Sequence, residues 1–294
     1  MKGNIIKISR FCTDDGPEIR TTVFLKGCPL KCLWCHNPES QSKEVEISFD
    51  AGKCIKCGKC ISVCDNGCHV IVDNEIKFLK DKCNKCLKCV NICPSKSLTV
   101  YGMVSTVDEV IDVVKKDILF YETSNGGVTI SGGEPLFQHQ FTIEILKKCR
   151  ELNIHTAIET SGFAGLDIFK EVISYCDFVL FDIKETDEEK HIEYTGVGNN
   201  VILNNLKFLN ESGVSYVIRC PIIPGLNDRD EHFEKLNNLI NFNQNFKGIE
   251  IMPYHTLGNY KYDNLQREYS LKTIKEPNKK LIEHWKNLLC KNSI

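Results

Sequence analysis

Three cysteines near the start of the chain have the type and spacing of ligands to an iron–sulfur cluster. Cys28, Cys32 and Cys35 lie in the run Gly27 to His36, which reads GCPLKCLWCH. A cube of four irons takes four ligands, and this run supplies three thiolates. One iron is therefore expected to stay open, in the way that a catalytic metal keeps one exchangeable position. The spacing predicts a cluster that binds a molecule and reacts with it.

The other clustered cysteines form an internal repeat. Each of its two runs has the pattern C-x-x-C-x-x-C-x-x-x-C, and the second run ends in Cys93-Pro94. The pattern is typical of bacterial ferredoxins, in which each cluster takes three ligands from one run and the fourth from the other. It predicts two further 4Fe-4S clusters, one held by Cys54, Cys57, Cys60 and Cys93 and the other by Cys64, Cys83, Cys86 and Cys89.

Two alternatives stay open for this repeat. The first run has no proline after Cys64, which makes Cys68 a candidate to replace it as a ligand. Zinc is the alternative metal, because CxxC pairs bind zinc too. The segment is also rich in lysine, which favours either the docking of an acidic flavodoxin or ferredoxin as electron donor or simple compensation of the negative clusters. These lysines are Lys53, Lys56, Lys59, Lys80, Lys82, Lys85 and Lys88.

Composition limits the class of protein. The chain has 294 residues, 42% of them hydrophobic and 26% charged, which fits one large α/β domain or two ordinary ones. A net charge of −2 argues against a nucleic-acid-binding protein. No apolar run reaches the roughly 18 residues of a membrane span, and the amino terminus does not resemble a signal peptide, so we expect a cytoplasmic protein with no membrane partner. In a reducing compartment the seventeen cysteines are not expected to form disulfides. The scattered ones are expected to be small buried hydrophobes; they are Cys12, Cys68, Cys149, Cys176, Cys220 and Cys290.

Apolar runs alternate with amphipathic stretches along most of the chain, which predicts βα units and a parallel sheet. The expected strands cover residues 22–25, 128–130, 155–158, 178–181, 216–219 and 248–251. The expected helices cover residues 140–152, 166–175, 201–211 and 231–242. Six such units predict an α/β fold, a partial (β/α)6 TIM-like barrel. An α+β, bacterial ferredoxin-like domain at 49–100 is inserted into this barrel core, which consists of residues 1–48 and 101–294. A last helix, at 278–290, places Leu281, Ile282, Trp285, Leu288 and Leu289 on one stripe that packs on the barrel.

Polar or glycine-bearing clusters follow the expected strands. Functional residues of such barrels lie at the carboxyl ends of the strands. Each cluster alone is typical of a turn or a cap, but together with the three cysteines they predict a pocket with backbone donors, carboxylates and a cation. Such a pocket suits a zwitterionic ligand. The clusters are Ser131 to Pro135, Glu159 to Gly162, Asp182 to Lys184, Arg219, and Pro253 to His255.

The CxxxCxxC loop, the GGEP turn and the strand-end DIK together resemble the radical S-adenosylmethionine superfamily. Four further segments are similar to those of the activating enzymes of glycyl radical enzymes, the family that includes pyruvate formate-lyase activating enzyme. These segments are Asp15 to Arg20, Cys35 to Glu39, Pro224 to Asn227, and Pro253 to Gly258. The resemblance covers essentially the whole chain. It implies an oxidoreductase that reductively cleaves S-adenosylmethionine to methionine and a 5′-deoxyadenosyl radical, which removes a hydrogen from a glycine of a partner enzyme under anaerobic conditions.

The same resemblance implies roles for individual residues. Gly132, Gly133 and Glu134 correspond to the turn that holds the methionyl amino group, and Asp182, Ile183 and Lys184 lie near its carboxylate and the ribose, with Lys184 counted among the catalytic residues. Glu159 and Thr160, with Asp182, correspond to a site for a monovalent cation. His255 corresponds to a cofactor-contacting histidine, and Trp34 and His36 lie near the adenine.

Where relatives have glycine, this chain has Glu18, in a loop that receives the glycine-bearing peptide, and Arg20 is expected to pair with that peptide. The partner is expected to be a glycyl radical enzyme, of the kind that three-cluster activating enzymes serve. Two alternatives remain: a radical S-adenosylmethionine enzyme that modifies another peptide or a small molecule, and a ferredoxin-like electron carrier with the barrel as scaffold.

Overall fold

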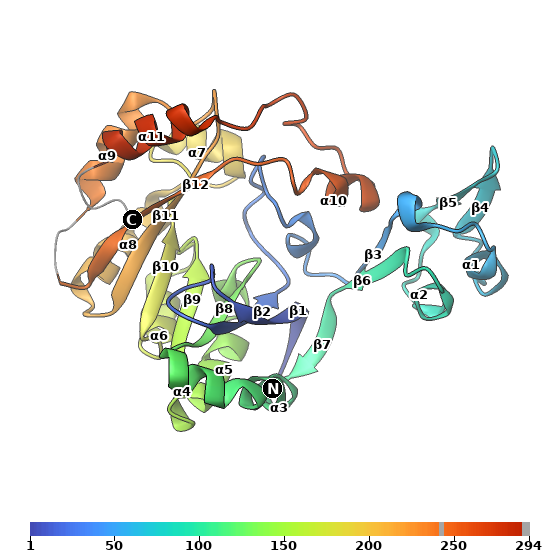
Figure 1. The fold of residues 1–294 in the computed structure, drawn as a ribbon, viewed down its shortest axis with the longest axis horizontal. Coiled ribbons are helices and arrows are strands. Elements are labelled where there is room, and N and C mark those ends of the chain that lie inside the picture. Colours follow the sequence, from blue (N-terminus) through green and yellow to red (C-terminus); the bar gives the residue numbers. More distant parts are fainter. Residues whose placement is uncertain (241–243, 290–294) are drawn as a thin grey trace.

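The computed structural model describes residues 1–240 and 244–289 and contains one large open sheet (Figure 1). Its strand order is β12-β11-β10-β9-β8-β2-β1-β7. The bounds are β1 Lys2–Cys12, β2 Arg20–Leu25, β7 Met103–Thr106, β8 Gly127–Gly132, β9 His155–Thr160, β10 Phe178–Asp182, β11 Ser215–Ile222 and β12 Phe246–Pro253. The six strands from β2 to β12 are parallel, which confirms the predicted strands and the parallel sheet. The antiparallel pair β1 and β7 at one edge was not predicted.

Seven helices of the described chain pack on the sheet and bury its apolar side chains. They are α3 Val107–Val114, α4 Ile118–Ser124, α5 His139–Glu151, α6 Leu166–Ile173, α8 Asn200–Glu211, α9 Asp230–Leu239 and α11 Lys279–Leu288. Two others, α7 Glu188–Thr195 and α10 Asn259–Asn264, contribute Tyr194 and Tyr262 to a separate apolar cluster. The four helices predicted between strands are α5, α6, α8 and α9, although α9 ends at Leu239 and the predicted end at Phe242 lies outside the described residues. One hydrophobic core joins the parallel strands to α5, α6, α8, α9 and α11.

The last helix and most of the isolated cysteines follow the sequence patterns, but Cys12, which was expected to be buried, is only partly buried. Trp285 is fully buried in the main core, and the other members of the α11 stripe pack there too. Cys149, Cys176 and Cys220 are buried in the same core, as small hydrophobes would be. Cys290 lies outside the described residues. No helix of the described chain is long and apolar enough to cross a lipid bilayer.

Residues 46–101 extend away from the sheet as a separate small unit (Figure 1). Its two ends pair with each other as β3 Glu46–Phe49 and β6 Leu98–Tyr101. Between them lie α1 Lys59–Ser62, the hairpin β4 His69–Val72 and β5 Glu75–Phe78, and α2 Lys88–Ile92, with short 3-10 turns η2 Ala51–Lys53 and η3 Lys80–Lys82. The remaining 3-10 turns of the chain are η1 Pro38–Ser40, η4 Lys115–Asp117 and η5 Pro135–Gln138. A second core of cysteines and a few apolar side chains fills the small unit.

The two halves of this unit share one backbone conformation. A positive φ occurs at Lys56 and Lys85, which hold the same place in the two cysteine runs. The same is true of Gly67 and Lys96. The sequence repeat is therefore also a structural repeat, in which equivalent residues can be compared directly.

Glu46 fastens the small unit to the rest of the molecule. Its carboxylate accepts hydrogen bonds from Lys26 Nζ at 3.0 Å and from Arg267 Nη2 at 2.6 Å, and it forms an ion pair with Lys80 at 3.5 Å. Lys26 comes from the end of β2, Arg267 follows α10, and Lys80 belongs to the small unit itself. Because these groups are largely withdrawn from water, the node holds three segments in one arrangement.

Candidate active site

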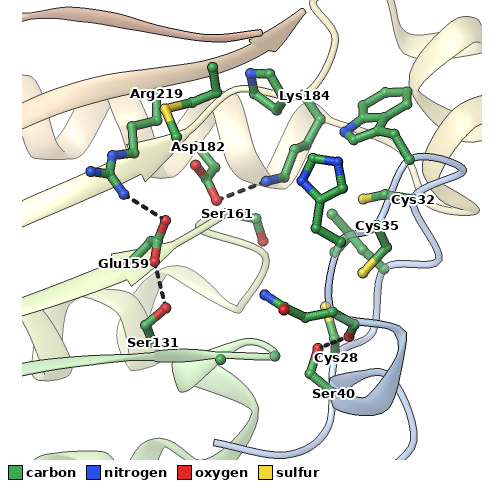
Figure 2. Close-up of a pocket in the computed structure, with 18 of the residues that line it drawn as sticks. Cys28, Cys32, Cys35, Ser40, Ser131, Glu159, Ser161, Asp182, Lys184 and Arg219 are labelled. Atoms are coloured by element: carbon green, nitrogen blue, oxygen red, sulfur yellow. Dashed lines mark hydrogen bonds and ion pairs between the residues drawn. The ribbon is translucent and has the colours of Figure 1, made fainter. Parts of the chain in front are cut away.

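A cavity of about 430 Å³ lies at the carboxyl ends of the parallel strands, a volume typical of small-molecule sites. It is lined by residues from all five of the predicted strand-end clusters and by the three cysteines of the first run (Figure 2). The structure therefore brings together what the sequence separated by more than two hundred residues. The lining includes Cys28, Cys32, Trp34, Cys35, His36, Ser131, Gly132, Gly133, Glu134, Glu159, Thr160, Asp182, Lys184, Arg219 and His255.

The cysteine loop is held at both ends by backbone hydrogen bonds. On one side Cys28 N–H donates to the Gln41 carbonyl at 3.0 Å. On the other, Lys31 and Leu33 N–H donate to the carbonyls of the last two residues of α7, at 2.7 and 2.9 Å. Helix ends leave such carbonyls without partners inside the helix, so α7 is well placed to bind the loop. The three thiols are consequently fixed along one wall of the cavity (Figure 2).

The chemistry of these thiols fits a metal cluster. Burial raises the pKa of Cys32 to about 12, and it also raises the pKa of Cys28 and of Cys35. A buried thiolate therefore needs a strong positive partner, which bound iron supplies. Within the described chain the cavity lining contains these three cysteines and no fourth.

Asp182 and Lys184 form an ion pair in the cavity, with Nζ 2.8 Å from Oδ2 (Figure 2). Burial acts to lower the pKa of Lys184, but the charge of Asp182 outweighs it and raises the pKa, so that the ammonium stays protonated. Ile183 faces the other way, as alternation along an extended chain requires, and its side chain lies in the main core. The prediction that Ile183 belongs to the ligand site is therefore corrected, because its side chain does not line the cavity.

Arg219 is a functional-site residue that the predicted ligand set did not include, although its place at a strand end was a signal for it. Its guanidinium donates to Glu159 at 2.9 Å, to Glu250 at 2.6 Å and to the Asp14 carbonyl. The Ser131 hydroxyl donates to the second oxygen of Glu159 (Figure 2). Burial acts to raise the pKa of Glu159, but Arg219 and Ser131 lower it, and the carboxylate stays ionised.

Glu134 braces the glycine turn. Its carboxylate accepts hydrogen bonds from the Ser161 amide at 2.9 Å, the Ser161 hydroxyl at 2.6 Å, the Leu136 amide at 3.1 Å and the Thr160 hydroxyl. The carboxylate thus ties the end of β8 to the end of β9. Gly133 brings the turn against the cysteine loop, because a Cβ there would lie 2.2 Å from the Gly27 carbonyl oxygen.

The groups predicted to hold a monovalent cation have other partners in this structure. Both oxygens of Glu159 are bound by Arg219 and Ser131, Asp182 is paired with Lys184, and the Thr160 hydroxyl donates to Glu134. These hydrogen bonds leave lone pairs on the Thr160 hydroxyl and on the carboxylate oxygens. The monovalent cation therefore stays a prediction, and we derive no step from it.

His36 and His255 form a stacked pair with ring centroids 3.8 Å apart. The His36 Nε2 lies 3.0 Å from the His255 carbonyl oxygen and therefore carries the proton that it donates. Burial, and then the neighbouring ring, lowers the pKa of His36 to about 4, so this ring stays neutral. Nothing in the described chain bonds the buried Nδ1 of His255, which leaves it free for a ligand in the cavity. Trp34 is both a core residue, packed on Tyr194, and part of the lining.

Arg20 does not reach toward the cavity mouth, contrary to the role expected for it. The side chain is fully buried, and its guanidinium donates to the Thr129 hydroxyl at 2.6 Å, the Val128 carbonyl at 2.6 Å and the Pro17 carbonyl at 3.0 Å. Burial lowers its pKa to about 10. Arg20 therefore anchors the 13–19 loop and is not available to pair with a peptide.

Glu18 lies in that loop with a φ of 62°, a left-handed conformation that costs a side-chain-bearing residue energy. We expect Glu18→Gly to raise the free energy of unfolding by about 0.5 to 1 kcal/mol. The substitution relieves the strain, but part of this gain is lost because glycine has more freedom in the unfolded chain. Urea unfolding measures the net change in the free energy of unfolding. The control is Glu44→Gly, at an exposed loop position without positive φ, which should lower stability. A loss of stability in both variants would contradict the strain at Glu18.

The small unit contains two further cavities, each lined by cysteines from both runs. The outer cavity, next to α1, is lined by Cys54, Cys57, Cys60 and Cys93. The inner cavity, next to α2, is lined by Cys64, Cys68, Cys83, Cys86 and Cys89, with His69. Although no three His, Cys, Asp or Glu side chains of the described chain surround a single point as ligands of one ion, each cavity collects one of the predicted sets of four. His69 was not predicted from the sequence.

Comparisons with known proteins extend this geometry. Residues 79–236 match the model of the Radical SAM superfamily, and residues 51–67 match that of a 4Fe-4S binding domain. The isethionate sulfite-lyase activating enzyme of Nitratidesulfovibrio vulgaris is 42% identical over 90% of this chain and 88% of its own length. The trans-4-hydroxy-L-proline dehydratase activating enzyme of Clostridioides difficile is 40% identical over 97% of this chain and 95% of its own length.

Among solved structures, a radical SAM methyltransferase from Sphaerobacter thermophilus shares the fold. Its TM-score is 0.54 at 13% identity, over 98% of this chain and 75% of that one.

Proposed function

The chain belongs to the radical S-adenosylmethionine superfamily and, within it, to the activating enzymes of glycyl radical enzymes, and from this we propose how its cavity generates the radical. Reductive cleavage of S-adenosylmethionine at a 4Fe-4S cluster supplies a 5′-deoxyadenosyl radical, which takes a hydrogen from a glycine of the partner. The observation that carries the assignment is a cavity with three cysteines on one wall and buried charges of both signs opposite them. The buried thiols also support a reducing, cytoplasmic location.

We assign Cys28, Cys32 and Cys35 as ligands of the catalytic cluster, because they are the thiols that line the cavity. Lys184 lines the same cavity and stays protonated, and it is assigned to the carboxylate end of a zwitterionic substrate. Asp182 holds Lys184 in place, and Glu159 is held by Arg219 at the neighbouring strand end. These groups orient the substrate without large rearrangement, because each is already fixed by a partner.

The remaining lining residues position the substrate and exclude water. We assign His255 and His36 to the nucleoside end, since their stacked rings face the cavity and the Nδ1 of His255 is unbonded within the described chain. Trp34 closes the same side with an apolar surface. The Gly132 to Glu134 turn supplies close backbone approach next to the cysteines, which suits the methionyl end.

We further propose that residues 49–100 form a ferredoxin-like domain with two 4Fe-4S clusters, inserted between the barrel segments 1–48 and 101–294. The two four-cysteine cavities support this. The domain is assigned as an electron relay from a flavodoxin or ferredoxin. A short contact path supports the relay: Gln266 Nε2 donates to the Phe78 carbonyl at 2.6 Å, and Tyr262 Oη donates to the Cys35 carbonyl at 2.8 Å.

The basic face of the domain is smaller than the sequence indicates. Lys56 pairs with Glu75, and Lys88 with Asp65. Docking of an acidic electron donor would therefore depend mainly on the other lysines of the segment, among them Lys59 and Lys85.

The proposed function is tested with anaerobically reconstituted protein, S-adenosylmethionine and dithionite. We expect 5′-deoxyadenosine without any partner, and a glycyl radical doublet in the electron paramagnetic resonance spectrum when the glycyl radical enzyme encoded by a neighbouring gene is added. A partner variant with alanine in place of the target glycine is the control and should give no doublet. Cleavage without a doublet on any such partner would favour a different peptide or small-molecule substrate.

A further inference from the structure

His69 is a polar side chain in an otherwise apolar and cysteine-lined core. Its exposed fraction is 2%, and neither ring nitrogen has a hydrogen-bond partner among the residues that the structure describes. The ring stacks on Phe78, its partner across the β4–β5 hairpin, with centroids 5.0 Å apart, which fixes the plane of the imidazole. The same ring lines the inner cavity, beside the cysteines.

The internal repeat shows what this position requires structurally. His69 is equivalent to Leu98, which is also buried in this core. An apolar side chain therefore fills the place in the other half of the domain. A buried imidazole donor that stays unpaired destabilises the fold relative to an apolar residue at the same place. A buried polar group without a protein partner points to a bound group that accepts its hydrogen bond.

The repeat also separates His69 from its neighbour Cys68. Cys68 is equivalent to Ser97, whose hydroxyl lies 3.2 Å from the Cys93 sulfur without being a cluster ligand of the predicted pattern. The Cys68 amide in turn donates to the Cys64 sulfur at 3.2 Å. By this equivalence Cys64 is the ligand and Cys68 lies beside it. Position 69 is then the place where this half of the repeat has a polar side chain and the other half has the apolar Leu98.

We propose that His69 donates a ring N–H hydrogen bond to a sulfur of the cluster held by Cys64, Cys83, Cys86 and Cys89, and thereby makes this cluster easier to reduce. The inference rests on the two-cluster domain proposed above. A hydrogen bond to sulfur stabilises the additional negative charge of the reduced cluster. The step is a one-electron reduction by an external donor such as dithionite; the proton stays on the ring nitrogen, and no bond is broken.

The position of the inner cavity indicates what an easily reduced cluster there would do. The carbonyl of Phe78, the stacking partner of His69, accepts the hydrogen bond from Gln266, and α10 with Tyr262 leads from there to Cys35. Helix α1, which lines the outer cavity, lies farther from the sheet than α2, which lines the inner one (Figure 1). An easily reduced inner cluster would therefore draw the electron from the outer cavity toward the catalytic cysteines.

The test is His69→Leu, which installs the residue that the repeat carries at the equivalent position. Reconstituted full-length protein is titrated with dithionite under electron paramagnetic resonance detection. We expect unchanged iron content and one reductive transition displaced to lower potential, with its equilibrium constant for reduction at least about threefold smaller. Electron–nuclear double resonance of the reduced clusters, recorded before and after transfer to deuterated water, should show one exchangeable proton coupling fewer in His69→Leu than in the wild type. His69→Gln, which keeps an N–H, should restore part of both signals.

The control is Ile47→Leu, a conservative change at a buried apolar residue that lines the same inner cavity, which should leave the transition near its wild-type position. Superimposable titrations of His69→Leu and wild type would overturn the proposal. Loss of one cluster's iron in His69→Leu would also overturn it, since His69 would then be a ligand. Failure of the two-cluster domain is recognised separately, because wild-type protein would then bind the iron of the catalytic cluster alone.

Discussion

Cys32→Ala is expected to abolish cleavage of S-adenosylmethionine and to remove one cluster's iron from the reconstituted protein. The variant leaves two thiols on a wall where three line the cavity, and both are partly buried. Substituting residues that only support metal ligands costs about 10- to 100-fold, so loss of a ligand should exceed about 100-fold. Quantification of 5′-deoxyadenosine after dithionite reduction, together with iron analysis, measures both effects.

The matched control is Cys149→Ala, the same substitution at a fully buried cysteine of α5 in the main core. It should keep its iron and its cleavage activity, because no cavity with clustered cysteines includes it. Substantial turnover by Cys32→Ala would show that the reaction occurs elsewhere. Equal losses in both variants would show that general destabilisation, and not ligand loss, explains the result.

Gly132→Ala is expected to lower the free energy of unfolding by roughly 2 to 6 kcal/mol, from backbone strain and overpacking together. The residue has a φ of 110°, and a Cβ there would lie 2.3 Å from the Leu25 nitrogen and 2.4 Å from the Leu25 oxygen. These are backbone atoms of β2, which cannot move aside as a flexible side chain can. The strand leads directly into the cysteine loop, so binding of S-adenosylmethionine should weaken as well.

Gly213→Ala separates the two contributions. Its φ is 84°, but no heavy atom lies within 4 Å of the place a Cβ would take. It should therefore lose only about 0.5 to 1 kcal/mol, the left-handed strain less the freedom that glycine has in the unfolded chain, with unchanged substrate binding. Urea unfolding and calorimetric titration with S-adenosylmethionine compare the variants. A Gly132→Ala variant no less stable than Gly213→Ala would mean that the close approach to β2 is not required.

The convergence of the strand-end clusters could be predicted, because parallel strands present their carboxyl ends at one edge of the sheet. Alternation along β10 could also have placed Ile183 in the core, between Asp182 and Lys184, had it been applied to this segment. The roles of Glu134 and Arg20 could not be predicted. Glu134 finds its donors on a different strand, and Arg20 is buried among carbonyl oxygens that no side-chain pattern reveals.

Two further features depended on tertiary structure. The antiparallel strands β1 and β7 pair through backbone groups at the sheet edge, which carry little signal in side-chain type. His69 could not be singled out from the sequence, where it is a lone histidine in a short hairpin. Its role was inferred only from its burial beside the inner cavity. The grouping of cysteines across the two runs, by contrast, was predicted from a spacing rule. Each cavity is lined by one predicted set, with Cys68 as a further cysteine in the inner cavity.

The antiparallel pairing of β3 with β6 brings the two ends of the insertion next to each other, with Phe49 opposite Leu98. A tight turn between these two ends would restore a continuous chain and leave every strand of the large sheet in place. The small unit can therefore be gained or lost in evolution by a single insertion or deletion. The proposed electron relay and the radical chemistry can in this way be inherited as independent parts.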